Sequence, residues 1–477
     1  MKTSPLAFLV FVIHLVAVTS FAGAQCEPGL DCNGNGILDS CDIADFNSDD
    51  CDGDGVPDEC QMTLDPSLDC NQDLILDSCE GTLEEILSSP NSAYGESLDM
   101  TSNWLAIGSP ETTTSGVTAG AVHLYRNIGS RWISAGTLHP PVPSESAEFG
   151  HSVAITDDIL VVGAPGSGSG SSQDEGAAYI YRRVGLNWTL EQQLEPAGDE
   201  DGAEFGISVA AEGDIVAVGA WYAQATSDSG AVYLYSHDGL NWNLDQLIES
   251  PDSSGDKHFA ASVELSGDIL LVTDPRADAG PEDDAGAVYA YKAFSATLWA
   301  FLQKITAPSP IDGGQFGHSI DVLGNQLLVG APNSGSGSRG EVHLFTRGIS
   351  TYSSTAMFSG EFSNNNMGKD VALNADGIIA GAWRATGNIG QIVVFQKDAS
   401  GSYQRENYVP TGALSGDRVG QRVATAGRWV AGASGVWNEW GVFRVKASSD
   451  TDQRLAANSG VAGHVSVWHT WFASAVA

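Results

Sequence analysis

Short apolar runs recur along the chain, and their spacing defines a long repeat. Each unit begins with "FG" or a near match, and successive units lie 51 to 57 residues apart. A β-rich run then ends in a corner such as "VVGAP" or "LVGAP", and runs such as "GAVYLY" and "WTLEQQL" complete the unit. The starting pairs are Tyr94-Gly95, Phe149-Gly150, Phe205-Gly206, Phe259-Ala260, Phe316-Gly317, Met367-Gly368 and Val419-Gly420. Four short strands per unit at this period predict a β-propeller, and seven units predict seven blades.

The composition of the predicted strands favours stacked blades. Runs such as "ILVV" and "AAYIY" are apolar at successive positions, so both faces of these strands are expected to be buried. Blades that pack face against face bury both faces, and small Gly and Ala residues let strands approach closely near a crowded axis. The sequence therefore predicts an all-β fold.

The two ends of the repeat region predict how the ring closes. The seventh unit stops after "GVFRV" at Val445, with no fourth strand behind it. The segment "TLEEIL" at residues 82–87 precedes the first unit and matches the missing strand. We expect this N-terminal strand to complete the last blade, because closure removes open sheet edges. No role is predicted for the tail at residues 447–477.

The repeats resemble the FG-GAP repeats of integrin α-subunit propellers and of many exported bacterial proteins. The resemblance spans residues 82–446 and implies a seven-bladed fold with a bias toward adhesion or ligand binding. Some blades of that family carry a calcium loop between "FG" and "GAP". Here the interval is a tight turn, such as Thr156-Asp157-Asp158 or Glu212-Gly213-Asp214, so no metal is assigned to the propeller.

A second, shorter repeat precedes the propeller. Three segments beginning at Asp31, Asp50 and Asp69 follow one another with a period of 19 residues and place oxygen-bearing side chains at alternate positions. A glycine at position 6 and an apolar residue at position 7 complete the layout of a calcium loop, in which position 7 gives its backbone carbonyl. The predicted ligands are Asp31, Asn33, Asn35, Ile37, Asp39 and Asp42; Asp50, Asp52, Asp54, Val56, Asp58 and Gln61; and Asp69, Asn71, Asp73, Ile75, Asp77 and Glu80. Leu74 replaces the glycine of the third loop, so we expect that site to be the weakest.

Seven residues separate consecutive loops, which leaves no room for the two flanking helices of an EF-hand pair. The pattern resembles thrombospondin type 3 calcium repeats over residues 26–80, with Ca²⁺ as the implied ligand. We therefore expect a small calcium-binding module at residues 25–81. Few large apolar side chains occur there, so bound metal and disulfide bonds would supply its stability.

All seven cysteines of the chain lie between residues 26 and 79. Pairing within loops would join Cys32 to Cys41, Cys51 to Cys60 and Cys70 to Cys79, leaving Cys26 unpaired. Pairing across linkers would join Cys26 to Cys32, Cys41 to Cys51 and Cys60 to Cys70, leaving Cys79. The sequence does not choose between these two patterns.

The start of the chain and its charge indicate where the protein works. Lys2, the apolar stretch from Leu6 to Val18 and small residues at Ala22 to Ala24 predict a secretory signal peptide at residues 1–24. No other segment is apolar enough to predict a transmembrane span. The net charge of −39 argues against nucleic acid and anionic lipid as partners.

Candidate catalytic residues are few. His151 and His318 follow "FG" in two units, and His123 and His343 occupy matching places in third strands, where the repeat could simply tolerate histidine. No nucleophile elbow, zinc-type histidine pair or phosphate loop is present in the sequence. We therefore expect no enzyme activity and no catalytic or cofactor-binding residues. A lyase or hydrolase of acidic polymers would require basic or histidine side chains gathered at one mouth of the ring.

The sequence favours an exported, calcium-binding adhesion or ligand-binding protein, secreted or at the cell surface, with a protein or glycan ligand. A structural matrix component without a discrete ligand is the main alternative, and the enzyme is the third.

Overall fold

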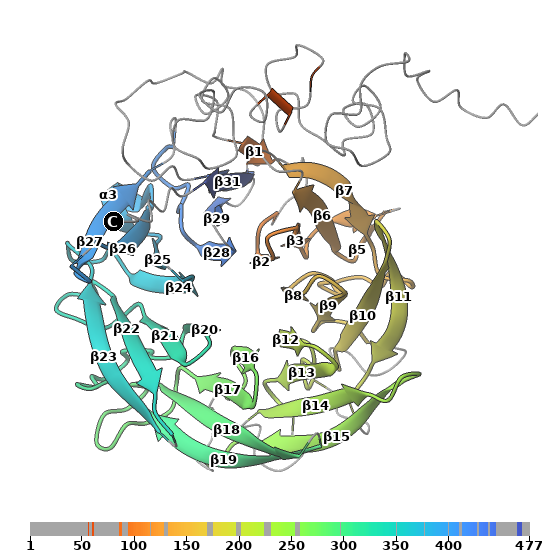
Figure 1. Cartoon of the computed structure of the whole chain (residues 1–477), viewed down its shortest axis with the longest axis horizontal. Helices are drawn as coiled ribbons and strands as arrows, with labels where there is room; N and C mark the ends of the chain where they lie inside the picture. The colour runs from red at the N-terminus through yellow and green to blue at the C-terminus, as the bar shows by residue number, and fades with distance from the viewer. Residues whose placement is uncertain are drawn as a thin grey trace, which may run out of the picture. The chain divides into compact units, whose positions relative to one another are not determined.

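The computed structural model describes most of the repeat region and little of the chain outside it. Described are Val56, residues 60–61, 85–87, 94–444 and 465–469, except 115, 128–131, 169–174, 197–201, 224–229, 253–257, 296, 350, 376, 399, 410–412, 427–428 and 437–438. By its internal contacts the chain divides into two units, Met1–Glu80 and Gly81–Ala477. The second unit is a ring of β-sheets (Figure 1).

Six sheets of the ring are regular four-stranded antiparallel blades, in which successive strands run from the centre outward (Figure 1). Blade 1 has β2 (Ser97–Met100), β3 (Trp104–Ser109), β6 (Ala121–Asn127) and β7 (Trp132–Leu138). Blade 2 has β8 (Ser152–Ile155), β9 (Ile159–Ala164), β10 (Ala177–Val184) and β11 (Asn187–Leu194). Blade 3 has β12 (Ser208–Glu212), β13 (Ile215–Ala220), β14 (Ala231–His237) and β15 (Trp242–Glu249).

The other three regular blades follow the same order. Blade 4 has β16 (Val263–Ser266), β17 (Ile269–Asp274), β18 (Ala287–Ser295) and β19 (Leu298–Ile305). Blade 5 has β20 (Ser319–Leu323), β21 (Gln326–Ala331), β22 (Glu341–Arg347) and β23 (Tyr352–Ser359). Blade 6 has β24 (Met367–Leu373), β25 (Gly377–Ala382), β26 (Ile392–Lys397) and β27 (Tyr403–Tyr408). A hairpin of β4 (Thr113–Thr114) and β5 (Val117–Thr118) and a short turn, α3 (Ala385–Asn388), lie in loops.

The last sheet departs from the prediction of seven equal blades. It contains β28 (Arg422–Ala426), β29 (Trp429–Val436), β30 (Glu439–Arg444), β31 (Val465–His469) and β1 (Glu85–Leu87). Both β30 and β31 pair with β29, and β1 pairs with β31 rather than with β30. The ring thus has six regular blades, not seven, and one irregular five-stranded sheet. The N-terminal strand joins that sheet as expected, but through a strand of the tail, for which no role was predicted.

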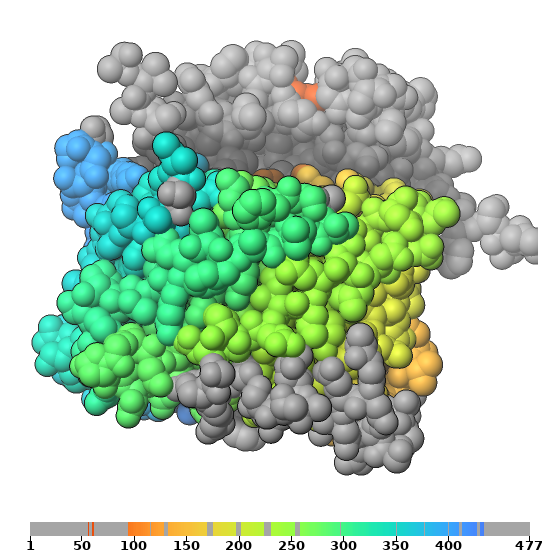
Figure 2. Space-filling model, turned by 90° about the horizontal axis from the view of Figure 1, so that it is seen from below, coloured from red at the N-terminus to blue at the C-terminus, as the bar shows by residue number. Residues whose placement is uncertain are grey.

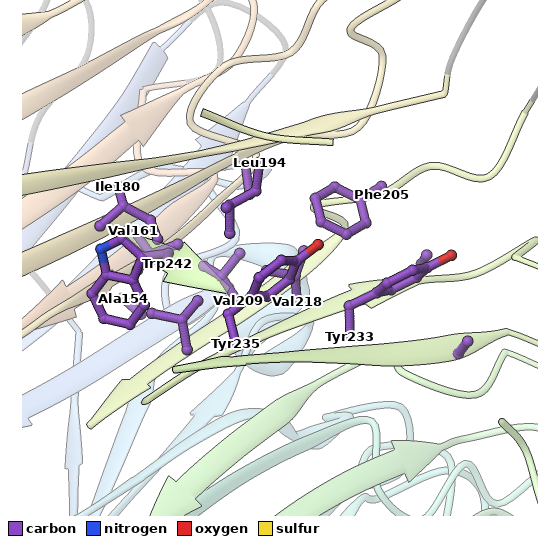
Figure 3. Packing of buried hydrophobic residues seen from close by; sticks show 14 of the residues in the cluster. Ala154, Val161, Ile180, Leu194, Phe205, Val209, Val218, Tyr233, Tyr235 and Trp242 are labelled. Atoms are coloured by element: carbon purple, nitrogen blue, oxygen red, sulfur yellow. The ribbon is translucent and has the colours of Figure 1, made fainter. Parts of the chain in front are cut away.

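Neighbouring blades pack through apolar faces, as the uninterrupted apolar runs predict. Between blades 2 and 3, Ile180 and Leu194 meet Val218, Tyr235 and Trp242 in one cluster (Figure 3). The second strand of each regular blade is almost wholly buried. The outermost strands of the middle blades, in green in Figure 2, form the exposed wall of the ring.

The "FG" pair fastens each blade to the one before it. Phe149 N donates to Ala119 O at 2.9 Å, and the ring of Phe149 packs edge-on against Tyr179 with centroids 5.2 Å apart. Gly120 has φ +91°, and a Cβ there would lie 2.2 Å from Phe149 O, so only glycine fits. The same backbone bond recurs at Phe205, Phe316, Met367 and Val419, so the motif is a structural joint that positions the start of these innermost strands.

Among the described residues, no helix has the length and hydropathy needed to cross a bilayer.

Candidate functional site

The residues that follow each "FG" pair meet in the middle of the ring. They lie on or just before β2, β8, β12, β16, β20, β24 and β28, which surround the centre in Figure 1. Together they line a cavity of about 470 Å³. The repeat-related lining residues are Glu96, Ser97, His151, Ser152, Ile207, Ser208, Ala261, Ser262, His318, Ser319, Lys369, Asp370 and Arg422. Because one joint repeats around the ring, residues far apart in the sequence face the same space.

A serine two places after the "FG" glycine holds the first strands in position. Ser97 Oγ donates to Gly150 O at 2.8 Å, and Ser152 Oγ donates to Gly206 O at 2.8 Å. Ser208 Oγ makes the same contact with Ala260 O at 2.7 Å. These bonds tie the innermost strands of adjacent blades together, so the wall of the cavity is preformed.

The side of the cavity formed by blades 5 and 6 carries positive charge. Lys369 Nζ lies 3.1 Å from Nε2 of His318. Burial, reinforced by the charges of Lys369 and Arg422, holds the pKa of His318 well below its usual value, so the imidazole is neutral at pH 7 and accepts from the ammonium. Burial and the Arg422 charge lower the pKa of Lys369 to about 8. Arg422 itself is paired with Glu96, with Nη2 3.4 Å from Oε1.

Aromatic side chains from blade 3 and the start of blade 4 line another part of the cavity. The rings of Trp221 and His258 are stacked, with centroids 4.6 Å apart and an interplanar angle of 18°, and both line the cavity. Tyr222, which is 38% exposed, meets the edge of His258. Trp221 is the last residue of the "AVGAW" corner, where four of the seven units have Pro.

Four carboxyl groups on the innermost strands repel one another across the centre. Burial raises the pKa of Asp99 to about 6, and burial with the Asp99 and Asp370 charges raises that of Asp321 to about 7. Burial and the charges of Asp321, Asp99 and Asp370 hold the pKa of Glu264 well above its usual value. Among the described residues, no three or more His, Cys, Asp or Glu side chains are arranged to hold a metal ion.

The histidines identified in the sequence separate into two kinds. His151 and His318 line the cavity. His123 instead packs against Tyr94, and His343 is buried against Phe316 with Nε2 3.2 Å from Glu341, so both belong to the blade interior. Sequence reasoning missed Lys369, Arg422, Arg276 and His258, although the first two occupy the same places after "FG" as His151 and Ser152. Histidine and basic side chains thus line one cavity, together with carboxyl groups.

The predicted calcium ligands lie outside the described residues, except Val56 and Gln61. Val56 is in a bend, and Gln61 follows Cys60 in one helical turn. Cys60 is buried and disulfide-bonded, which both predicted pairing patterns allow.

Comparison with known proteins identifies the repeat. A sequence model described as "FG-GAP repeat" matches residues 132–181 and 188–235. The chain contains FG-GAP repeats. These two matches span the last strand of blade 1, blade 2 and the first three strands of blade 3. No curated protein matches the chain.

Several solved structures are similar to the FG-GAP propeller. A putative 6-phosphogluconolactonase from Bacteroides fragilis NCTC 9343 is 13% identical, with a TM-score of 0.47 over 70% of this chain and 88% of that one. One from Bacteroides uniformis ATCC 8492 is 10% identical, with a TM-score of 0.46 over 66% and 85%. The periplasmic gluconolactonase of Pseudomonas aeruginosa is 17% identical, with a TM-score of 0.45 over 76% and 92%. These values are too low to transfer an activity.

Proposed function

We propose that this chain is an exported, calcium-binding protein whose FG-GAP propeller binds a ligand in the central cavity and does not transform it. Residues 1–24 would direct export, and the loops at residues 25–81 would hold Ca²⁺. The ligand would be an extracellular glycan or protein segment. The integrin-like resemblance of the repeats agrees with such a role.

The cavity lining is the observation that carries this proposal. The strand interiors repeat from blade to blade, whereas the residues after "FG" change among Glu96, His151, Ile207, Ala261 and Lys369. Placing an ammonium in this partly desolvated channel costs free energy, as its lowered pKa indicates, and the fold does not require it. Polar groups held where the fold gains nothing from them are typical of binding sites.

Filling the cavity tests the proposal. Arrays of glycans and peptides, probed with and without calcium, would first supply a ligand. Ala261→Phe, which adds a ring to the cavity wall, should then abolish binding of the hit in calorimetry. Ala135→Phe, on the exposed outer strand β7, is the matched control and should leave binding unchanged. Binding that survives Ala261→Phe in a folded protein would place the ligand elsewhere.

A lyase or hydrolase is the second candidate, because a neutral imidazole beside a lysine of lowered pKa is suited to proton transfer. Incubation with uronic acid polymers and sugar lactones, followed by chromatography, distinguishes the two. Products that disappear with Lys369→Gln would mean catalysis. A structural component without a ligand would remain silent in both the array and the incubation.

A further inference from the structure

We infer that the ligand of the central cavity is an acidic sugar, with its carboxylate beside Lys369 and its ring near Trp221. This inference rests on the cavity being the binding site proposed above. It adds the chemical class of the ligand, which follows from the residues that line the cavity.

Lys369 is the cation positioned to receive the carboxylate. In the part of the chain that the structure describes, its Nζ contacts the neutral imidazole of His318 at 3.1 Å. Arg422, by contrast, is paired with Glu96. An ammonium carries three N–H donors, so Lys369 can hold His318 and still donate to an anion. The His318 contact also keeps Nζ directed along one wall, so the charge is oriented before a ligand enters.

Another part of the lining offers an apolar face, and the lining also has unused polar atoms. The stacked Trp221 and His258 rings form an aromatic surface, and the electron-rich face of such a ring attracts the polarised C–H groups of a sugar. Trp221 Nε1 and Ser319 Oγ, the latter on blade 5 next to His318, are buried and make no hydrogen bond with the described residues. A buried donor without a partner costs free energy, and sugar hydroxyls accept as well as donate hydrogen bonds.

The charges of the lining disfavour a ligand with more than one negative charge. The cations Lys369, Arg276 and Arg422 stand beside Glu96, Glu264 and Asp370 in the same lining. A phosphate, which is doubly charged near neutral pH, would be repelled by these carboxyl groups more strongly than a monoanion. The carboxyl groups can instead accept from hydroxyl groups. The volume of about 470 Å³ lies within the range of small-molecule sites and suits one or two sugar rings.

Calorimetric titration of the full-length protein tests the inference. The probes are glucuronate, galacturonate and gluconate, with glucose and galactose as neutral counterparts. At least one acid should bind about tenfold more tightly than its neutral counterpart, as one ionic contact allows. Lys369→Gln should remove that preference, Lys369→Arg should retain it, and the exposed Lys397→Gln should leave it unchanged.

Two matched tryptophans test the aromatic wall. Trp221→Leu should weaken acid and neutral sugar together by about tenfold. Trp383→Leu should change neither, because Trp383 ends the equivalent "IAGAW" corner of blade 6 but lies between Arg384 and Arg418, outside the cavity lining. Melting curves of each variant separate lost binding from lost folding.

The outcomes distinguish the acidic-sugar assignment from the assignment of the cavity as the binding site. Equal affinity for acids and neutral sugars, or a Lys369→Gln variant that keeps the preference, overturns the acidic-sugar assignment. Binding of peptides but of no sugar, abolished by Ala261→Phe, also overturns it and leaves the cavity as the binding site. Sugar binding that Ala261→Phe does not affect overturns both the cavity as the binding site and the acidic-sugar assignment.

Discussion

Lys369 places an ammonium where no other unit has a lysine or arginine. Because its pKa is lowered, the charge of this one group can be titrated in a binding experiment. The groups facing it are His318, Arg422, Glu96 and Asp370; burial and Arg422 lower its pKa to about 8, while the two carboxyl groups oppose the shift. The ammonium is present below pH 8 and is lost as pH rises through that value.

The affinity for an acidic sugar should therefore be nearly constant from pH 6.5 to 7.5 and about tenfold weaker by pH 9 to 9.5. Titration calorimetry with glucuronate or galacturonate across this range gives the measurement. Lys369→Arg is the control, because a guanidinium stays charged and should remove the decline. A decline that persists in the Arg variant would assign the titration to another group.

Glu264 provides a residue-scale prediction about stability. The pKa of its carboxyl group is raised in the folded protein, so folding takes up a proton. The folded protein is therefore destabilised relative to the unfolded chain as pH rises above the unfolded pKa of about 4.5 toward the folded pKa. Glu264→Gln removes this penalty and the repulsion from Asp321. The variant should raise Tm at pH 8 by about 1–3 °C and leave it nearly unchanged at pH 4.5.

Differential scanning calorimetry at both pH values measures this effect. Glu249→Gln, on the exposed side of β15, is the control and should give no pH-dependent difference. An identical Tm for wild type and Glu264→Gln at pH 8 would show that the carboxyl groups across the centre do not repel one another.

The sequence could predict only some of the cavity residues, because the positions that face the centre depend on how the ring closes. The sequence pointed to His151 and His318 because histidine is rare and both follow "FG". It could not rank Lys369 or Trp221, because which repeat positions face the centre, and which wall each blade forms, follows only from the closed ring. The predicted calcium ligands lie mostly outside the described residues and stay predictions.

At the scale of elements, glutamines on the outer strands join neighbouring blades. Gln192 on β11 donates from Nε2 to Trp242 O at 2.9 Å, and its Oε1 accepts from Trp242 N at 2.8 Å. Gln246 and Gln303 make the same two-way contact with Trp299 and Tyr352. The "Q" of the fourth-strand motif is thus a joint between blades.

Removing one such joint should be measurable. Gln192→Ala leaves two half-buried backbone groups of Trp242 without partners and should cost about 1–3 kcal/mol of unfolding free energy. Gln193→Ala, next to it, loses only an exposed contact with Glu195 and should stay within about 0.5 kcal/mol of wild type. Denaturant unfolding compares the pair. Equal effects of the two changes would mean that the joint does not stabilise the ring.

Element prediction succeeded where the repeat signal was present and failed where it ended. Six blades follow the predicted order because "FG", "GAP" and the third-strand motif recur in each. The last sheet was mispredicted because β31 lies in the tail, where no repeat motif marks a strand. Pairing of β1 with β31 is a contact between the start of the repeat region and the tail, which local patterns do not encode.

Truncations test that sheet. Ending the chain at residue 446 removes β31 and leaves β1 without its partner, so it should lower Tm or cause aggregation through exposed edges. Deleting residues 82–87 should have the same effect, whereas deleting residues 25–81 should leave a folded ring. Calorimetry and size-exclusion chromatography distinguish these outcomes. A tail truncation with the wild-type melt would show that β31 contributes no stability.

At the scale of the whole molecule, the chain joins two parts with different sources of stability. The propeller buries large apolar clusters at every interface between regular blades. Residues 25–81 instead hold 16 acidic residues, no Lys or Arg and all seven cysteines. A segment of that composition cannot fold on apolar burial alone, so we expect calcium and disulfide bonds to replace a core.

Calcium removal should therefore act on one part only. Extracellular calcium loops typically bind with dissociation constants of about 10⁻⁴ to 10⁻³ M, and binding free energy is folding free energy where no other core exists. A chelator should increase the protease sensitivity of residues 25–81 and leave the Tm of the propeller nearly unchanged.

Asp50→Ala combined with Asp54→Ala should remove one binding event from a calcium titration, because two of the carboxylates opposing the ion's charge are lost. Asp45→Ala with Asp65→Ala, between the predicted loops, is the matched control and should leave all events in place. A titration unaltered by the Asp50 and Asp54 changes would mean that these carboxylates are solvated surface groups and that the loops bind no calcium.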